Sequence, residues 1–369
     1  MKILIVGKPF FPIISPRSFR TTELAKEFIR LGHEVTVCVA DNGYSYDNFL
    51  KKYPIRIIFG GKQNGFIDSM KSKSSNRHGL QYLFFRTAQK ITNYLFEYPG
   101  FRGCSLIHKV LKNESNFDVL ISIANPYSVH FAVCKAMKRN PQLAKRWISD
   151  CGDPFTGSPM GHHAFYWKYI EKWWAKATDF ITIPIEEGKI AYHKECRGKI
   201  RIIPQGFNFD EINLAEYHRN TIPTFAYAGA ILRFHRDPSN FLNYLLTLQF
   251  DFKFIVYTRQ FEYFVKCESL LGNKLECRSF IPREELLLEL SKMDFLIDIK
   301  NESSLHKPSK LIDYALTKRP VLEISTAFKE QNNFDAFLKG DYSSAMEIKD
   351  ISQYDIRNVA NHFLSLASE

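Results

Sequence analysis

The stretch LHKPSKLIDYALTKRPVL, residues 305–322, determines the fold and the kind of site that the sequence predicts. Pro308 suits the first turn of a helix because its missing N–H costs nothing there, and the Ser309 side chain can satisfy free backbone amides. Such a helix start attracts anions through its free amides and its positive dipole end. Lys310 adds a mobile positive charge, so we expect a phosphate group to bind here.

An acidic residue follows on the same predicted helix. Asp313 lies one turn after the helix start, where its carboxylate would accept two ribose hydroxyls of a bound nucleotide. A capped amphipathic helix without any ligand is the alternative interpretation. The flanking apolar runs at 293–299 and 320–324 predict strands, and hence a β-loop-α-β unit. Ligands bind beyond the carboxyl ends of such strands, here at residues 301–308, which favours the binding site.

The pattern around this helix resembles the signature of glycosyltransferase family 4. In that family a strand, a loop and a helix with an acidic residue before Tyr-Ala or Ala-Met end in Gly-Lys-Pro-Val. This chain has Asp313-Tyr314-Ala315 and Lys318-Arg319-Pro320-Val321. The resemblance implies that Leu311 also belongs to the donor-binding residues.

Further segments resemble the same family, in the right order, along nearly the whole chain. They include a first βαβ unit with Gly-His-Glu-Val at its turn, a strand-and-loop that ends in Asp-Pro, and segments similar to the family's "AD-strand" and "IPNGVD". These segments lie at residues 1–37, 147–154, 177–183 and 202–208.

Length and pattern predict two domains. A chain of 369 residues suggests two domains of ordinary size, and strands that alternate with helical stretches predict doubly wound α/β sheets. The resemblance implies the GT-B fold, in which two Rossmann-like domains face each other across a cleft. We expect an acceptor-binding domain at 1–205 and a nucleotide-sugar-binding domain at 206–350. A C-terminal helix at 351–369 is expected to return to the first domain, as it does in relatives.

Cationic side chains follow the strand predicted at 224–229. Gly229 ends this strand, and the family places cations after it against the donor diphosphate. In the commoner form an arginine follows the glycine directly and a lysine comes several residues later. Ala230 takes the arginine position here, so Arg236, nearest the lysine position, is the first candidate and Arg233 the second. Arginine holds phosphate through a planar fork, whereas a solvated basic loop is the alternative.

One acidic residue of the family pattern is missing. Relatives carry two glutamates with seven residues between them, and the first contacts the transferred sugar. Asp313 matches the second, whereas Leu305 stands in the place of the first. Glu302 and His306 flank the gap, and both are donor-site candidates because the spacing does not choose between them.

The loop at 10–18 replaces the Gly-Gly turn with which many relatives approach phosphate closely. Ser15, Arg17 and Arg20 lie in this loop and at the start of the following helix, on the acceptor side. The two arginines could meet phosphate with their side chains in place of a close backbone approach. Ordinary solvation of a helix end explains them equally well.

Asp153 is the main candidate for an acidic group that faces the acceptor hydroxyl. A carboxylate at a strand end can orient or deprotonate a hydroxyl within hydrogen-bond reach. Asp150 is the alternative candidate, and a simple Asp-Pro turn is the other interpretation. His33 and His130 are expected to be structural.

The resemblance implies transfer of a sugar with retained configuration from a UDP- or GDP-linked donor to a hydroxyl. The acceptor would be a glycan or a lipid-linked molecule in the synthesis of bacterial surface polysaccharide, such as capsule or lipopolysaccharide. Arg236, Lys310 and the helix amides would stabilise the leaving diphosphate. The sequence has neither metal-ligand spacing nor an Asp-x-Asp motif, so we expect no metal and no cofactor.

Positive charge is concentrated in one segment. The chain has a net charge of +11, and residues 62–112 hold nine Lys or Arg against two acidic residues, or +7. Such a segment suits an anionic membrane surface when aromatic rings interleave with the cations. Nucleic acid would use the same residues, but no recognised module for it accompanies them, and partial burial of the rings is the plain alternative. The rings are Tyr82, Phe84, Phe85, Tyr94, Phe96, Tyr98 and Phe101.

The seven cysteines form no paired spacing typical of zinc or of a disulfide framework, which suits a reducing cytoplasm. Residues 1–7 form a short predicted strand that leads into a polar loop, so we expect neither a signal peptide nor a membrane-spanning run. We expect a cytoplasmic protein that is peripheral at the inner face of the plasma membrane.

Two other classes of protein stay open. A nicotinamide-dependent oxidoreductase would use a similar sheet, but residues 7–12 lack the G-x-G-x-x-G turn for close pyrophosphate approach. A catalytically inactive GT-B-like subunit, which binds nucleotide sugar or membrane in an assembly, is consistent with the missing glutamate and the altered glycine loop. Retention of Arg236, Lys310 and Asp313 favours the enzyme.

Overall fold

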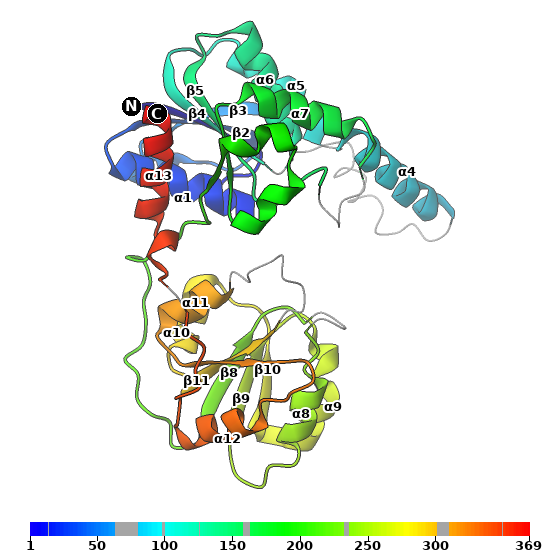
Figure 1. Ribbon diagram of the computed structural model, residues 1–369, viewed down its shortest axis with the longest axis vertical. Helices are drawn as coiled ribbons and strands as arrows, with labels where there is room; N and C mark the ends of the chain where they lie inside the picture. Colours follow the sequence, from blue (N-terminus) through cyan, green and yellow to red (C-terminus); the bar gives the residue numbers. More distant parts are fainter. Residues whose placement is uncertain are drawn as a thin grey trace. The chain divides into compact units, whose positions relative to one another are not determined.

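The chain forms two compact units (Figure 1). Unit 1 comprises Met1–Asn208 and Gln353–Glu369, and unit 2 comprises Phe209–Ser352. The boundaries expected from the sequence are residues 205 and 350. The computed structural model describes residues 1–13, 15–62, 80–97, 100–124, 126–157, 163–231, 236–300, 310–348 and 350–369.

Unit 1 is built on a seven-stranded parallel sheet in the order β3-β2-β1-β4-β5-β6-β7. Strand β1 lies between β2 and β4, and all of its residues after Lys2 are buried because helices cover both faces of the sheet. The strand order changes direction at β1 and β4, and ligands bind beyond the carboxyl ends of strands at such a point. The strands are β1 (Lys2–Val6), β2 (Glu34–Asp41), β3 (Arg56–Lys62), β4 (Phe117–Ile123), β5 (Ala144–Asp150), β6 (Phe180–Ile183) and β7 (Ile200–Ile202).

Two apolar cores hold the helices of unit 1 against its sheet. Helices α1 and α13 pack on one face, and α5, α6 and α7 pack on the other. The helices are α1 (Pro16–Arg30), α2 (Asp47–Lys52), α4 (Leu80–Phe96), α5 (Gly100–Leu111), α6 (Ser128–Arg139), α7 (Trp167–Ala177) and α13 (Ile356–Ser368), with 3-10 turns at Glu186–Ala191, Lys194–Lys199 and Ser352–Tyr354.

Helix α1 begins where the sequence favours a start. Ser15 is its N-cap, and the Ser15 hydroxyl accepts a hydrogen bond from the backbone N of Ser18 at 3.1 Å. Pro16 occupies the first helical position, and Gly32 follows the helix with a φ of 81°. The Ser15 cap and Pro16 therefore fix the start of this helix.

The last helix, α13, packs on the N-terminal sheet. Its apolar stripe, including Val359 and Phe363, is buried in the same core as α1. The backbone of Phe207 joins the chain that enters this helix: it donates to Tyr354 O and accepts from Ile356 N, both at 2.8 Å. Both chain termini consequently belong to unit 1 (Figure 1).

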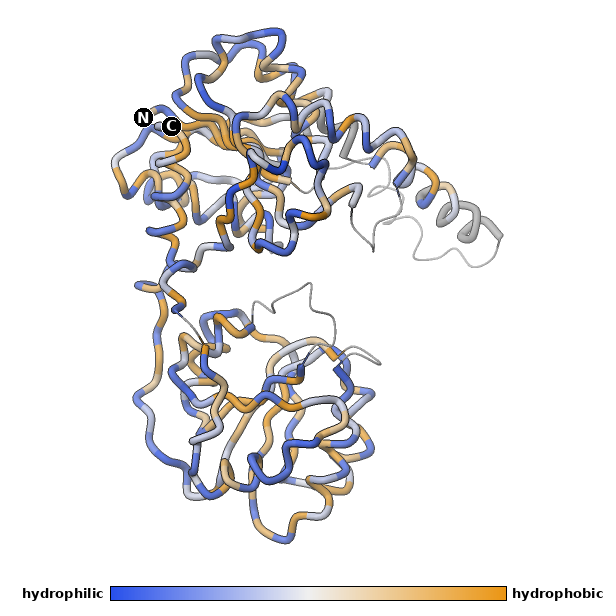
Figure 2. Tube along the Cα trace, viewed as in Figure 1, coloured by the Kyte–Doolittle hydropathy of each residue, from blue (hydrophilic) through white to orange (hydrophobic). Residues whose placement is uncertain are grey.

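Unit 2 repeats the architecture on a smaller scale. Its five-stranded parallel sheet has the order β10-β9-β8-β11-β12, and apolar residues concentrate in the strands of both sheets (Figure 2). Helices α8, α9 and α12 share one core with the sheet, and α10 and α11 lie on the other core. The elements are β8 (Thr224–Ala228), α8 (Ser239–Leu245), β9 (Lys253–Tyr257), α9 (Val265–Leu271), β10 (Leu275–Arg278), α10 (Arg283–Leu290), β11 (Phe295–Ile299), α11 (Lys310–Thr317), β12 (Val321–Ile324) and α12 (Gln331–Lys339), with 3-10 turns at Phe261–Tyr263 and Gly272–Lys274.

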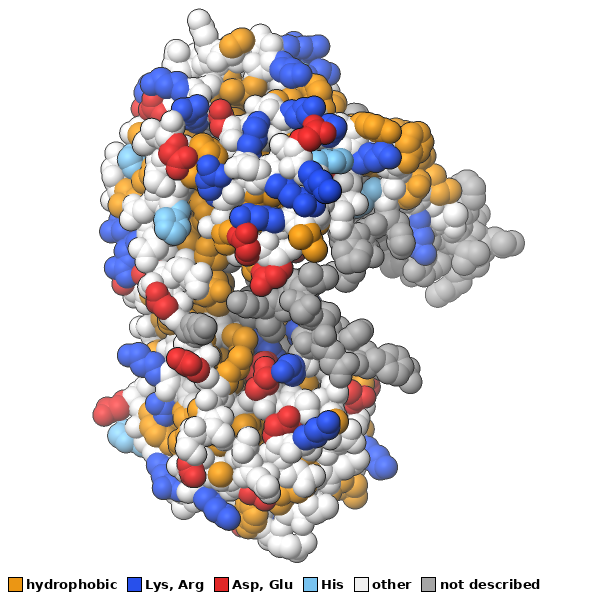
Figure 3. All heavy atoms as spheres, viewed as in Figure 1, with side chains coloured by type: hydrophobic (Ala, Val, Ile, Leu, Met, Phe, Trp, Pro, Cys, Tyr) orange, Lys and Arg blue, Asp and Glu red, His pale blue; other side chains and the backbone are white. Residues whose placement is uncertain are grey.

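Helix α4 leaves apolar side chains in contact with solvent. Ile91, Tyr94 and Phe96 are 53%, 44% and 49% exposed. Apolar side chains gather on the surface where this helix meets the start of α7 (Figure 3). Tyr94 and Phe96, two of the seven rings in this segment, are therefore largely outside the core. The side chains of the other five rings lie outside the described residues. Within the described ranges, none of the helices is both long and apolar enough to cross a membrane.

Candidate functional site

In unit 2, a buried ion pair lies next to the ends of β8 and β11. Lys310, the first residue of α11, places its Nζ 2.5 Å from Oδ1 of Asp298 in β11. The same Nζ lies 4.5 Å from the ring centroid of Tyr227 in β8. Burial lowers the pKa of Lys310, and the negative charge of Asp298 opposes this shift. Of these three residues, the sequence predicted only Lys310.

Arg236 brings a second positive charge to this ion pair. Its charge adds to the lowering of the pKa of Lys310, and its Nε has no hydrogen-bond partner among the described residues. A Cβ added to Gly229 would lie 3.0 Å from Oη of Tyr227 and 3.6 Å from Cδ of Lys310. A glycine therefore leaves room beside the lysine. Three predicted donor-site residues, Gly229, Arg236 and Lys310, lie together, with two cations against one carboxylate.

Asp313 is paired with an arginine that the sequence did not suggest. Oδ1 of Asp313 accepts a hydrogen bond from Nε of Arg283 at 2.8 Å and lies 2.6 Å from its Nη2. Burial raises the pKa of Asp313, although the charge of Arg283 opposes the shift. This pair joins α10 to α11, and the assignment of Asp313 to ribose hydroxyls stays a prediction.

Of the other predicted donor-side residues, the structure describes only Leu311. Leu311 is partly buried against the apolar core that α10 and α11 share with the sheet. Arg233, Glu302, His306, Pro308 and Ser309 lie outside the described residues.

In unit 1, Arg17 and Asp153 meet after the carboxyl end of β5. Nη2 of Arg17 lies 3.8 Å from Oδ2 of Asp153, whose side chain is 75% exposed. The arginine passes close over Gly152, because a Cβ added there would lie only 1.3 Å from Nη2. An exposed carboxylate beside a guanidinium can bind a hydroxyl, as predicted for the acceptor side. Ser15, another residue predicted for the acceptor side, is the N-cap of α1.

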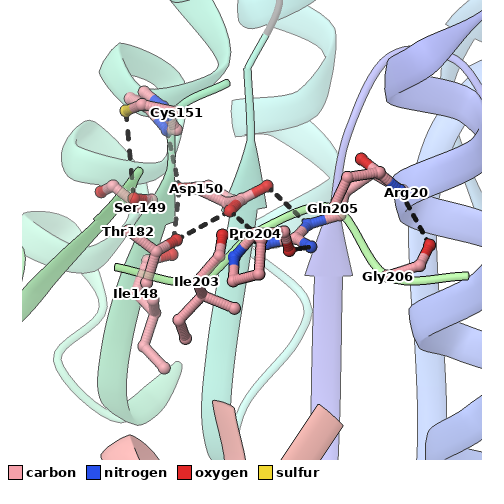
Figure 4. A network of polar contacts seen from close by, with 12 residues as sticks. Arg20, Ile148, Ser149, Asp150, Cys151, Thr182, Ile203, Pro204, Gln205 and Gly206 are labelled. Carbon is pink, nitrogen blue, oxygen red and sulfur yellow. Dashed lines mark hydrogen bonds and ion pairs between the residues drawn. The ribbon is translucent and has the colours of Figure 1, made fainter. Parts of the chain in front are cut away.

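Arg20 and Asp150, two other predicted acceptor-side residues, form a buried pair (Figure 4). Arg20 donates from Nε to Oδ2 at 3.1 Å and from Nη2 to Oδ1 at 2.9 Å, and their side chains are only 3% and 4% exposed. Nη1 also donates to the carbonyl of Pro204 at 2.5 Å, and Thr182 donates to Asp150 at 2.7 Å. Burial alone would raise the pKa of Asp150, but Arg20, together with Arg17 and Thr182, outweighs burial and the pKa is lowered. The structure places this pair in the interior, where it joins α1, β5 and β6.

His130 lies in the interior of unit 1, where it bonds to other side chains. Its Nδ1 lies 2.8 Å from Oγ of Ser122, which in turn accepts from Nε1 of Trp147 at 2.8 Å, and its Nε2 lies 3.4 Å from Sγ of Cys151. Burial lowers the pKa of His130 to about 3, so this ring stays neutral at physiological pH. Within the part of the chain that the structure describes, no three His, Cys, Asp or Glu side chains are grouped to hold a metal ion.

No protein-family model matches the chain, and no curated protein matches its sequence. Solved structures do match it. A glycosyltransferase from Rickettsia africae has a TM-score of 0.63 and 13% identity, over 100% of this chain and 97% of that chain. HepE from Anabaena in complex with UDP-glucose has a TM-score of 0.58 and 10% identity, over 100% and 99% of the two chains.

A variant of TarM from S. aureus, in complex with fondaparinux, alpha-GlcNAc-glycerol and UDP, is also similar. Its TM-score is 0.58 at 12% identity, over 100% of both chains. At such identities the similarity establishes the fold. Together with the two parallel sheets, it confirms the predicted GT-B fold.

Proposed function

We propose that the protein is a retaining glycosyltransferase, similar to family 4, that transfers a sugar from a UDP- or GDP-linked donor. The observation that carries this proposal is the pair of cations, Lys310 and Arg236, beside Gly229 in the C-terminal domain of a GT-B fold. Two of the similar proteins were crystallised with UDP or UDP-glucose, which supports a nucleotide diphosphate as the ligand.

The two cations would act on the leaving group. As the bond between the anomeric carbon and the phosphate oxygen breaks, negative charge grows on the diphosphate, and Lys310 and Arg236 stabilise it. The acceptor oxygen bonds to the same face of the sugar, and its proton passes to the departing phosphate. Each fixed donor of this kind is worth about 3–4 kcal/mol of barrier. Because side chains supply this charge, we propose a reaction without a metal.

The other predicted donor-side residues complete this proposal. Asp313 would bind ribose, and the helix start would bind phosphate. The residues assigned to these contacts and to the transferred sugar are Arg233, Glu302, His306, Pro308, Ser309 and Leu311.

On the acceptor side, we assign Asp153 to orient the incoming hydroxyl. Its carboxylate is exposed, and Arg17 lies beside it to bind a phosphate or a polar group of the acceptor. We propose a glycan or lipid-linked acceptor in bacterial surface polysaccharide synthesis. The alternative, an inactive subunit, would bind the nucleotide sugar but would not transfer its sugar.

A panel of nucleotides tests the proposed function. UDP or GDP should raise the melting temperature of the purified protein by several degrees, because a ligand that binds only the native state stabilises it. One sugar conjugate should raise it further and then be consumed when acceptor is added. Binding of that conjugate without turnover on any acceptor would favour the inactive subunit, and a shift with NAD alone would overturn the proposal.

We also propose that unit 1 contacts an anionic membrane surface through α4 and the start of α7. Two hydrogen bonds join α4 to the start of α7 and the residues just before it. Ala164 N donates to Tyr94 O, and the indole Nε1 of Trp167 donates to Leu95 O, both at 3.2 Å. Phe165 and Tyr169 are 75% and 60% exposed beside them. Rings that enter the interface and lysines that meet lipid phosphates support this surface, and Lys90 and Lys168 are both exposed.

Vesicle flotation tests the membrane surface. The protein should float with vesicles that contain phosphatidylglycerol, less at high salt, and not with pure phosphatidylcholine. Phe165→Ser combined with Tyr169→Ser should weaken binding about tenfold or more, since two rings no longer enter the interface. The matched control is Phe250→Ser with Phe261→Ser, two exposed rings of unit 2. Equal flotation of both double variants would contradict this surface.

A further inference from the structure

Strand β11 carries one acidic residue, Asp298, among apolar ones. All five residues of the strand are buried, and Asp298 is 2% exposed. The strand lies in the interior of the sheet, between β8 and β12. A carboxylate in such a place costs several kcal/mol unless a counter-charge lies beside it. Asp298 therefore depends on a cationic partner.

Lys310 is that partner, and it is held from two sides. Its Nζ lies 2.5 Å from Oδ1 of Asp298 and 4.5 Å from the ring centroid of Tyr227, and its side chain is only 11% exposed. A lysine normally has a flexible four-carbon stem whose ordering costs free energy when a ligand binds. Here Asp298 and Tyr227 already position the ammonium group before a ligand binds.

We propose that Asp298 is a positioning residue for the donor: it holds the ammonium group of Lys310 where the diphosphate binds. This inference rests on the proposed function for the identity of the ligand. Asp298 itself does not touch the diphosphate, because two negative groups would repel each other. It acts through Lys310, while Arg236 adds a second positive charge.

Asp298 also keeps the lysine charged. Burial lowers the pKa of Lys310, Asp298 opposes this shift, Arg236 adds to it and Glu323 opposes it more weakly. Asparagine at position 298 has nearly the same shape but no charge, so the pKa of Lys310 should fall further. A neutral amine does not balance the charge of a diphosphate.

Pyrophosphate binding, measured by calorimetry on the full-length protein, tests the inference. Wild type and Asp298→Asn are compared over a series of pH values from neutral up to the usual lysine pKa of about 10.4. The dissociation constant of the variant, divided by that of wild type, should rise about tenfold across this range. The matched control is Asp294→Asn, which removes a buried acid just before the same strand.

Asp294 accepts hydrogen bonds from Oη of Tyr217 at 2.8 Å and from the backbone N of Thr224 at 2.7 Å. Its replacement should lower stability and leave the pH dependence of pyrophosphate binding as in wild type. A constant affinity ratio for Asp298→Asn, or a wild type that does not bind pyrophosphate, overturns the inference. If pyrophosphate behaves as expected but no nucleotide sugar is bound or consumed, the proposed function fails and the role of Asp298 stands.

Discussion

Replacement of Lys310 by alanine is expected to lower kcat/KM for the nucleotide sugar about 10²–10³-fold, the loss typical of one fixed donor to a developing negative charge. Alanine also leaves Asp298 buried without a counter-charge, since the lysine Nζ lies 2.5 Å from it. The free energy of unfolding should therefore fall by about 3–5 kcal/mol. Steady-state rates and denaturant unfolding measure the two effects separately.

Two further variants separate the loss of chemistry from the loss of stability. Lys310→Met combined with Asp298→Asn removes both charges and keeps the stem, so stability should recover while the rate stays low. Arg236→Ala should lower the rate to a similar degree with little change in stability, because its Nε has no hydrogen-bond partner among the described residues. Wild-type rates in Lys310→Ala and Arg236→Ala would contradict the assignment of these two residues to the donor site.

The positions of Gly229 and Lys310, both predicted for the donor side, could be inferred from the sequence because local order determines them. Gly229 follows β8 directly, and Lys310 opens the helix after β11, so a parallel sheet brings both to its carboxyl edge. The same rule placed Asp153 after β5. Each of these predictions needed only the recognition of a strand and of the residues just after its carboxyl end.

The partner of a charged side chain could not be predicted in the same way. Asp313 is separated from Arg283 by 30 residues, and Arg20 from Asp150 by 130 residues. Only the topology brings such pairs together, and neither spacing nor residue type indicates them. Asp298 did give a signal: a single acid within an apolar strand requires a counter-charge in the fold.

Lys318 departs from the family motif in residue type, and its backbone conformation explains why the glycine position matters. It stands where the resemblance expects glycine, and its φ is 57°, in the left-handed region that favours glycine at the end of a helix. The exposed lysine keeps the turn that the motif needs between α11 and β12.

The Arg20–Asp150 pair carries the second large expectation. Arg20→Ala should lower the free energy of unfolding of unit 1 by about 3–5 kcal/mol, because it leaves the Asp150 carboxylate buried and unpaired. Lys145→Ala removes an exposed ion pair with Asp118 and should cost less than about 1 kcal/mol, which makes it the matched control. Denaturant unfolding monitored in unit 1 measures both.

The pH dependence distinguishes the ion pair from a general packing effect. The pKa of Asp150 is lowered in the folded protein, so its stabilising contribution is present above the usual carboxyl pKa of about 3.9 and is lost as pH falls through the lowered value. The stability difference between wild type and Asp150→Asn should therefore be large near neutral pH and shrink in acid. A difference that does not change with pH would point to packing alone. If Arg20 instead met phosphate on the acceptor, Arg20→Ala would keep its stability and raise KM for the acceptor, the opposite of what its burial predicts.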